Sequence, residues 1–140
     1  MLKTISDEFY LGTIEVFSKL KALFVYAVGT TVYIWGLKYV QAGSAYELWL
    51  EGSLGLEIKF DKAVEQLPKV VNFYWTMKCL LQQTMDVVRE LEAEHRKMLK
   101  QYRFTSFPAE NLSSFVNPSI MKLTEAEGKT GMSEIGPFYI

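Results

Sequence analysis

The stretch ALFVYAVGTTVYIWGL, residues 22–37, decides how the rest of the chain is interpreted. It holds no charged residue, and Lys21 and Lys38 stand directly before and after it. As a helix it would span about 24 Å, against the roughly 30 Å of a bilayer's hydrocarbon core. The stems of the two lysines would make up much of the difference. The stretch therefore predicts a single transmembrane helix over about residues 20–40.

Aromatic side chains gather towards the end of this stretch. Tyr33, Trp35 and Tyr39 each combine an apolar ring with a polar edge, which suits the boundary between lipid and water. Together with Lys21 and Lys38, they are the residues predicted to lie at the membrane interface. The predicted environment of this segment is therefore the lipid bilayer.

Small residues recur every seven positions along the same stretch, at Ala22, Gly29, Gly36 and Gly43. A stripe of small side chains lets a neighbouring helix approach closely, which is how helices associate inside a bilayer. We therefore predict that Ala22, Gly29 and Gly36 pack against helices of partner subunits. The alternative is a buried core helix of a globular domain, because an apolar run this short lies near the boundary between the two classes.

The composition narrows the function classes. The chain has 140 residues, 49% of them hydrophobic, which is enough for one modest domain. Its net charge of −1 argues against a nucleic-acid-binding protein that relies on a basic field. Cys79 and His95 are the only residues of their kinds, so a cysteine-rich metal site and a disulfide framework are excluded. We expect no cofactor and no metal.

The chain divides into four segments. These are an N-terminal amphipathic helix and membrane anchor (1–43), a connector (44–68), a long interaction helix (69–103) and an extended tail (104–140). The predicted fold class is therefore all-α and extended, with a largely irregular C-terminal tail.

The connector carries conflicting signals. Its apolar residues fall almost entirely on even positions, a period of two that is typical of a strand, and Gly52-Ser53 suits a hairpin turn. Ser44 and Glu47 also match a capping box that would start a helix over 45–51. We favour a short helix followed by an extended segment.

The long helix is predicted from a repeat of spacings four and three. Its apolar stripe supplies a continuous packing face, as in a helix laid against others. The residues expected to form that face are Val70, Tyr74, Met77, Leu81, Thr84, Val88, Leu91, His95, Met98 and Tyr102. His95 is interpreted as a hydrogen-bonded interface residue, and Cys79 as a packing residue.

One motif in the tail matches a nucleotide-binding loop only in part. Residues 127–130, Glu-Gly-Lys-Thr, resemble the end of a phosphate-binding loop, but Leu123 stands where that loop needs its first glycine. Nucleotide binding is therefore not expected, and we predict no catalytic residue.

These patterns together predict a non-catalytic accessory subunit of a multisubunit membrane complex, with the other subunits as its partners. The mitochondrial inner membrane, in a respiratory or ATP-synthase assembly, is the expected location, because small single-span subunits are common there. The alternative is a helical interaction or scaffold protein, such as a viral component, that oligomerises through residues 70–102.

Overall fold

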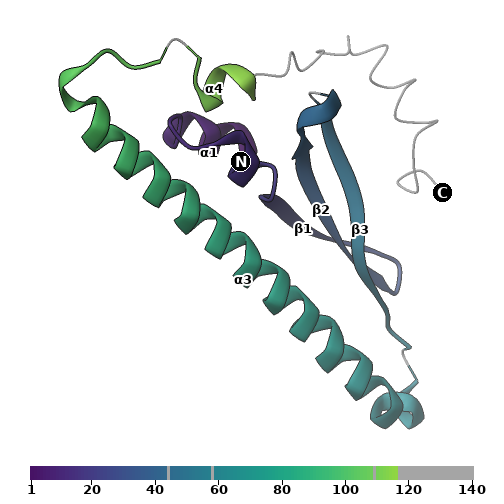
Figure 1. Cartoon of the computed structure of the whole chain (residues 1–140). Coiled ribbons are helices and arrows are strands. Elements are labelled where there is room, and N and C mark those ends of the chain that lie inside the picture. Colours follow the sequence, from purple (N-terminus) through teal and green to yellow (C-terminus); the bar gives the residue numbers. More distant parts are fainter. Residues whose placement is uncertain (44, 58, 109, 117–140) are drawn as a thin grey trace, which may run out of the picture.

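The computed structural model of the chain describes residues 1–43, 45–57, 59–108 and 110–116, so predictions for 117–140, residues 127–130 included, lie outside the described residues. A long helix runs diagonally beside a three-stranded sheet, and the short helices gather near one end of both (Figure 1). The elements in chain order are α1 (Leu2–Glu8), α2 (Ile14–Phe17), β1 (Lys21–Val28), β2 (Thr31–Val40), η1 (Gln41–Gly43), β3 (Ala45–Gly55), η2 (Phe60–Lys62), α3 (Ala63–Gln101), η3 (Tyr102–Phe104) and α4 (Leu112–Phe115).

The apolar stretch 22–37 folds as a β-hairpin. β1 and β2 pair antiparallel, and the last pair, Val28 with Thr31, leaves Gly29 and Thr30 as a two-residue turn. Gly29 has a φ of +56°, a conformation that glycine adopts without the strain of a side chain. The flanking residues are mostly β-branched or aromatic, which favours strands over helices.

The prediction of an all-α chain with a transmembrane helix over 20–40 is therefore wrong. Within the described part of the chain, no helix is both long and apolar enough to cross a bilayer. The predicted membrane location, with the mitochondrial inner membrane, rested on that helix and is wrong with it. Uniform apolarity misled the prediction because a hairpin with two apolar faces shows no alternation along its sequence.

The sheet has the order β1-β2-β3, with both neighbouring pairs antiparallel. Ile34 pairs with Gly52, but its neighbour Trp35 pairs with Leu50, so Glu51 is an additional residue on β3. This β-bulge shifts the alternation of β3 by one residue. The apolar even positions of residues 46–56 therefore divide between the two faces of the sheet, with Leu48 and Leu50 on one and Leu54 on the other.

The connector thus differs from its prediction. Residues 45–51, where a short helix was favoured, belong to strand β3, and Gly52-Ser53 lies within that strand and makes no hairpin turn. The long helix begins at Ala63, before Pro68, and not near Lys69. Pro68 has no N–H to donate to the carbonyl of Val64, a residue that is 82% exposed and so open to water.

Helix α3 has 39 residues and is about 58 Å long. Its first half packs against one face of the sheet through the sheet–helix cluster, in which Ile34, Leu54 and Phe73 are buried and Leu23, Val32, Val70, Met77 and Leu80 pack around them. Further along, the Thr84 hydroxyl donates to the carbonyl of Lys21 at 3.1 Å. The helix therefore crosses that face from β3 towards the start of β1.

The second half of α3 packs against both ends of the described chain. This terminal cluster buries Leu2, Val16, Phe17, Leu20, Tyr39, Leu91, Leu112 and Val116. The Leu112 amide donates to the Tyr10 carbonyl at 2.8 Å, which ties α4 to the N-terminal segment. The predicted N-terminal amphipathic helix is instead two short helices, α1 and α2, and apolar residues of this segment supply much of the cluster.

Candidate interaction surfaces

The face of the sheet that points away from α3 carries large apolar side chains on all three strands. Alternation and the register place them on one side, opposite the residues of the sheet–helix cluster. We call this the open-face surface; it consists of Phe24, Tyr26, Val28, Tyr33, Trp35, Leu48 and Leu50. Five of the seven are between 38% and 51% exposed, namely Phe24, Tyr26, Val28, Leu48 and Leu50.

The cross-strand pairs make this surface continuous. Phe24 lies opposite Trp35, and Trp35 lies opposite Leu50, so one row of apolar side chains crosses all three strands. None of the seven is an Asp, Glu, His, Lys or Arg residue. The surface is suited to exclude water against another apolar surface, and the polar groups of its side chains are the hydroxyls of Tyr26 and Tyr33 and the indole N–H of Trp35.

The two lysines predicted at a membrane interface lie on the other face of the sheet. Lys21 Nζ is 2.7 Å from Glu51 Oε1, and the Glu51 side chain is only 14% exposed. Lys38 Nζ is 3.8 Å from Glu47 Oε2 and lies 5.5 Å from the centre of the Trp49 ring. These ammonium groups are therefore partners of carboxylates within the fold.

The three aromatic residues predicted at the membrane interface do not lie together in the fold. Tyr33 and Trp35 are half-buried members of the open-face surface, while Tyr39 is buried in the terminal cluster and its ring centre lies 5.5 Å from that of Tyr46. Burial, with the Tyr39 hydroxyl as a further cause, raises the pKa of Tyr46. The small-residue stripe is dispersed as well, because Gly29 forms the hairpin turn and Ala22 and Gly36 lie within strands.

The predicted packing stripe of the long helix divides between its two sides. Val70 and Met77 pack in the sheet–helix cluster, and Val88 and Leu91 contribute to the terminal cluster. Met98 is half-buried beside the N-terminal segment. Tyr74 and Leu81 are exposed, at 56% and 47%. The stripe thus contains the core-facing residues of α3 together with part of its outer side.

His95 holds the N-terminal segment against α3. Its Nδ1 accepts a hydrogen bond from the Leu11 amide at 3.3 Å, and its ring meets that of Tyr10 edge-on, with the centres 4.9 Å apart. Burial lowers the pKa of His95, while the nearby Glu8 carboxylate acts in the opposite direction. His95 is thus a contact residue within one chain, and Cys79 is exposed on α3.

A groove of about 380 Å³ lies between the end of β3 and α3. Its polar lining includes Glu51, Lys69, Asn72 and Thr76, but Glu51 is engaged by Lys21 and the Thr76 hydroxyl donates to the Asn72 carbonyl. Among the described residues, no three His, Cys, Asp or Glu side chains are grouped so that they could hold a metal ion. The open-face surface is therefore the stronger candidate for a functional site.

Comparisons of the chain with protein-family models, with curated proteins and with solved structures found no match.

Sequence reasoning missed the open-face surface as a unit, although it had singled out Tyr33 and Trp35. Phe24, Tyr26 and Val28 alternate with Leu23, Val25 and Ala27, and all six are apolar, so no periodicity separates the faces of β1. The signal that could have found the surface is the alternation of Tyr46, Leu48 and Leu50. That alternation predicts a strand with one apolar face, and such a strand needs a neighbour.

Proposed function

We propose that this protein is a non-catalytic subunit that assembles with another protein chain through its open-face surface. The observation that carries the proposal is the exposure of Phe24, Val28, Leu48 and Leu50 on one sheet face. Contiguous apolar patches of a few hundred Å² are typical of interaction sites on proteins. A membrane complex is not proposed as the setting, because residues 22–37 form a hairpin.

The surface also defines the chemistry of the partner. Taking about 150–250 Å² for a whole aromatic side chain, its seven members expose on the order of 500 Å². That area suits the apolar centre of a protein interface, where aromatic residues commonly supply most of the binding energy. Because the surface carries no charge, the partner presents a flat, uncharged apolar face, such as a second sheet or the apolar stripe of a helix.

Site-specific photo-crosslinking tests the proposal. A photoreactive phenylalanine analogue replaces Leu50 in the full chain, expressed with an affinity tag in the cells of origin. The matched control carries the analogue at Lys97, an exposed residue on the far half of α3. We expect a crosslink from position 50 to one defined partner chain and none to that chain from position 97. Equal crosslinking from the two positions, or none from position 50, would contradict the proposal.

A second test introduces a positive charge into the open-face surface. Leu50→Lys places an ammonium group at the β3 end of the apolar row without touching the buried clusters. It should abolish co-purification of the crosslinked partner while leaving the circular dichroism spectrum of the chain unchanged. If a folded Leu50→Lys chain still bound the partner, the interface would lie outside the open-face surface.

A further inference from the structure

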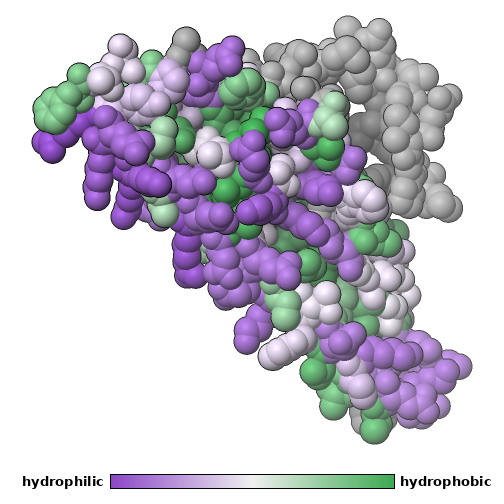
Figure 2. Space-filling view, in the orientation of Figure 1, coloured by the Kyte–Doolittle hydropathy of each residue, from purple (hydrophilic) through white to green (hydrophobic). Residues whose placement is uncertain are grey.

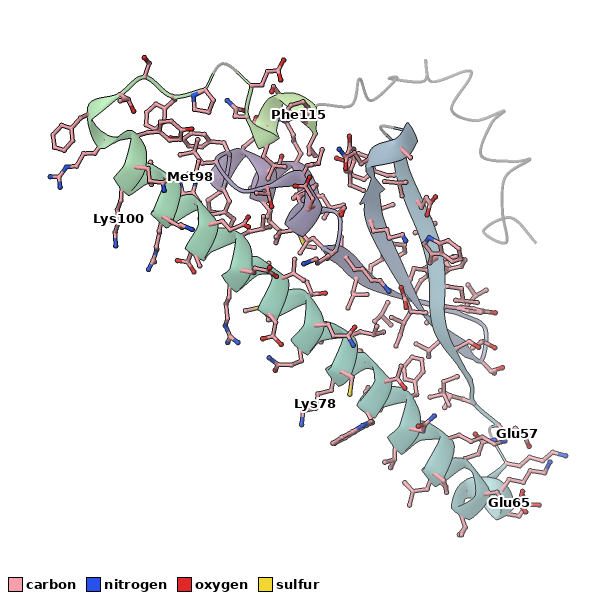
Figure 3. All side chains as sticks on the ribbon, viewed as in Figure 1. Glu57, Glu65, Lys78, Met98, Lys100 and Phe115 are labelled. Atoms are coloured by element: carbon pink, nitrogen blue, oxygen red, sulfur yellow. The ribbon has the colours of Figure 1, made fainter. Side chains whose placement is uncertain are left out.

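The outer side of α3 carries a second apolar stripe, distinct from the residues that hold the helix to the sheet. Its spacing alternates three and four residues over three heptads, as in the contact seam of a coiled coil. We call it the helix seam; it consists of Val64, Leu67, Val71, Tyr74, Lys78, Leu81 and Met85. Figure 3 shows Lys78 pointing away from the sheet, which places the seam on the outside of the molecule.

The seam is exposed along its whole length. Its six uncharged members are between 47% and 82% exposed, and Trp75 beside them is 60% exposed. With Trp75 included, these side chains expose on the order of 800 Å², again taking about 150–250 Å² for a whole aromatic side chain. A stable protein interface buries about 800 Å² on each partner, so the seam together with Trp75 is of the size that a dimer needs.

The fold does not use the seam. The residues that hold α3 to the sheet lie on a neighbouring side of the helix, centred about 100° around its axis from the seam; they are Val70, Phe73, Met77 and Leu80. Beyond Met85 the outer side turns charged, with Arg89, Glu92, Arg96, Lys97 and Lys100. Hydrophilic side chains accordingly crowd the half of α3 nearer the short helices, while hydrophobic ones appear towards its other end (Figure 2). The apolar seam therefore ends at Met85.

We propose that the helix seam binds the same seam of a second copy of this chain, with the two α3 helices antiparallel. Lys78 is the observation that selects the orientation. In a parallel, in-register pair the two Lys78 ammonium groups would meet at the centre of the interface, which is repulsive. An antiparallel pair separates them, and the register that sets Lys78 opposite the partner's Tyr74 places each ammonium over an aromatic ring.

Contacts within the chain are consistent with that role. Lys78 Nζ already lies 4.9 Å from the centre of the Trp75 ring, and an aromatic face holds a cation more strongly when water is excluded. In the same register Leu81 lies opposite Val71 and Met85 opposite Leu67, so apolar residues meet on both sides of the lysine. A single lysine in a seam lowers affinity while it specifies pairing.

The flanks of the seam favour a second copy over a charged partner helix. The residues beside it on the Trp75 side are Pro68, Trp75, Gln82 and Arg89, and those on the other side are Ala63, Val70, Met77 and Thr84. Only Arg89 among these eight is charged. Partner choice between different helices commonly depends on opposite charges at such positions, and these flanks carry no such pattern.

Sedimentation equilibrium on the full chain tests the pairing. We expect a mass twice the 16.1 kDa of one chain at micromolar concentration, falling to one chain on dilution. Val71→Glu should raise the dissociation constant at least about 100-fold, because it puts an unpaired carboxylate in the seam. The control Gln83→Glu adds the same charge at an exposed position outside the seam and should change the dissociation constant less than about threefold.

Lys78→Leu distinguishes the role of the lysine. It should tighten the dimer at least about tenfold, because a polar seam residue lowers affinity. A chain that stays monomeric at 100 μM in both the natural and the Lys78→Leu form would overturn the proposal. A dimer that Val71→Glu leaves intact would overturn it as well, while Leu50→Lys, on the sheet, should not alter the dimer.

Distances between spin labels determine the orientation. In the proposed register, labels on the two copies of Cys79, the only cysteine, lie about 9 Å apart along the helix axis. Labels at Lys97→Cys, in a Cys79→Ser background, lie about 63 Å apart along it. A parallel pair gives short distances at both positions, and that result would exclude the antiparallel arrangement.

Discussion

Gly36 lies directly beneath Glu51, so that a Cβ on Gly36 would come within 2.7 Å of Glu51 Oε1. Glu51 is the residue that bulges from β3, and the Lys21 ammonium holds its carboxylate at 2.7 Å. A small residue is therefore needed at position 36 because a charged pair lies across β2. Gly36 was predicted to let a neighbouring helix approach closely. Another group does come close to it, but that group is the Glu51 side chain.

Gly36→Ala should lower the free energy of unfolding by about 1–3 kcal/mol, because the new methyl group displaces Glu51 from Lys21. Gly52→Ala is the matched control on the neighbouring strand, where a Cβ meets no atom within 4 Å. Urea denaturation of the two variants measures the difference. If both variants lost the same free energy of unfolding, the flexibility of glycine, and not the contact with Glu51, would account for the loss.

Glu94→Ala should destabilise the chain by about 1–2 kcal/mol. Glu94 Oε2 accepts from the Thr13 amide at 2.9 Å and from the Thr13 hydroxyl at 3.0 Å, and Thr13 also caps helix α2. Glu92→Ala is the control, since Glu92 pairs with the exposed Arg96 one turn along the same helix. Its effect should stay within about 0.5 kcal/mol. Thermal unfolding of both variants tests this difference.

Acid should weaken the fold through His95. Its pKa in the folded state lies below the ordinary value of about 6.5, so the unfolded chain binds the proton more readily. The stability that neutral His95 contributes is complete above about pH 6.5 and is lost as the pH falls from there through the folded pKa. Protonated Nδ1 also cannot accept from the Leu11 amide. His95→Gln should remove the pH dependence in this window, as followed by urea denaturation at a series of pH values.

Gln66→Leu should raise the free energy of unfolding by about 1 kcal/mol. The Gln66 side chain is buried, at 8% exposure, and its Oε1 has no hydrogen-bond partner among the described residues. A buried acceptor without a donor costs about 1–3 kcal/mol, and an apolar side chain of similar size removes that cost. Gln82→Leu, an exposed change on the same helix, serves as the control for helix propensity. Loss of stability in Gln66→Leu would reveal a donor for that oxygen.

The long helix could be predicted from the sequence because its apolar residues recur with helical spacing over many turns. Its start was placed wrongly, because the helix was predicted to begin at residue 69, just after Pro68, and it begins at Ala63. The hairpin was missed because β1 and β2 are apolar on both faces, which erases the period of two. The bulge at Glu51 was also unpredictable, because it depends on pairing between β2 and β3 that no local pattern in β3 specifies.

The site was predicted in part. Tyr33 and Trp35 were singled out as amphipathic aromatics at a boundary, and they lie on the open-face surface of a sheet and not on a transmembrane helix. Tyr74 and Leu81 were placed in a packing stripe, and they lie in the helix seam. Which side of a helix faces the core depends on where the sheet lies, and the heptad pattern alone contains no information on that.

The terminal cluster joins Leu2 to Val116, so this core cannot close until nearly all of the described chain has been synthesised. During translation the hairpin emerges long before the residues from α3 and α4 that complete the packing beside it. Contacts so distant in sequence form slowly, and the exposed apolar strands are open to aggregation meanwhile. We therefore expect the nascent protein to depend on chaperones, and a chain truncated before Leu112 to be degraded.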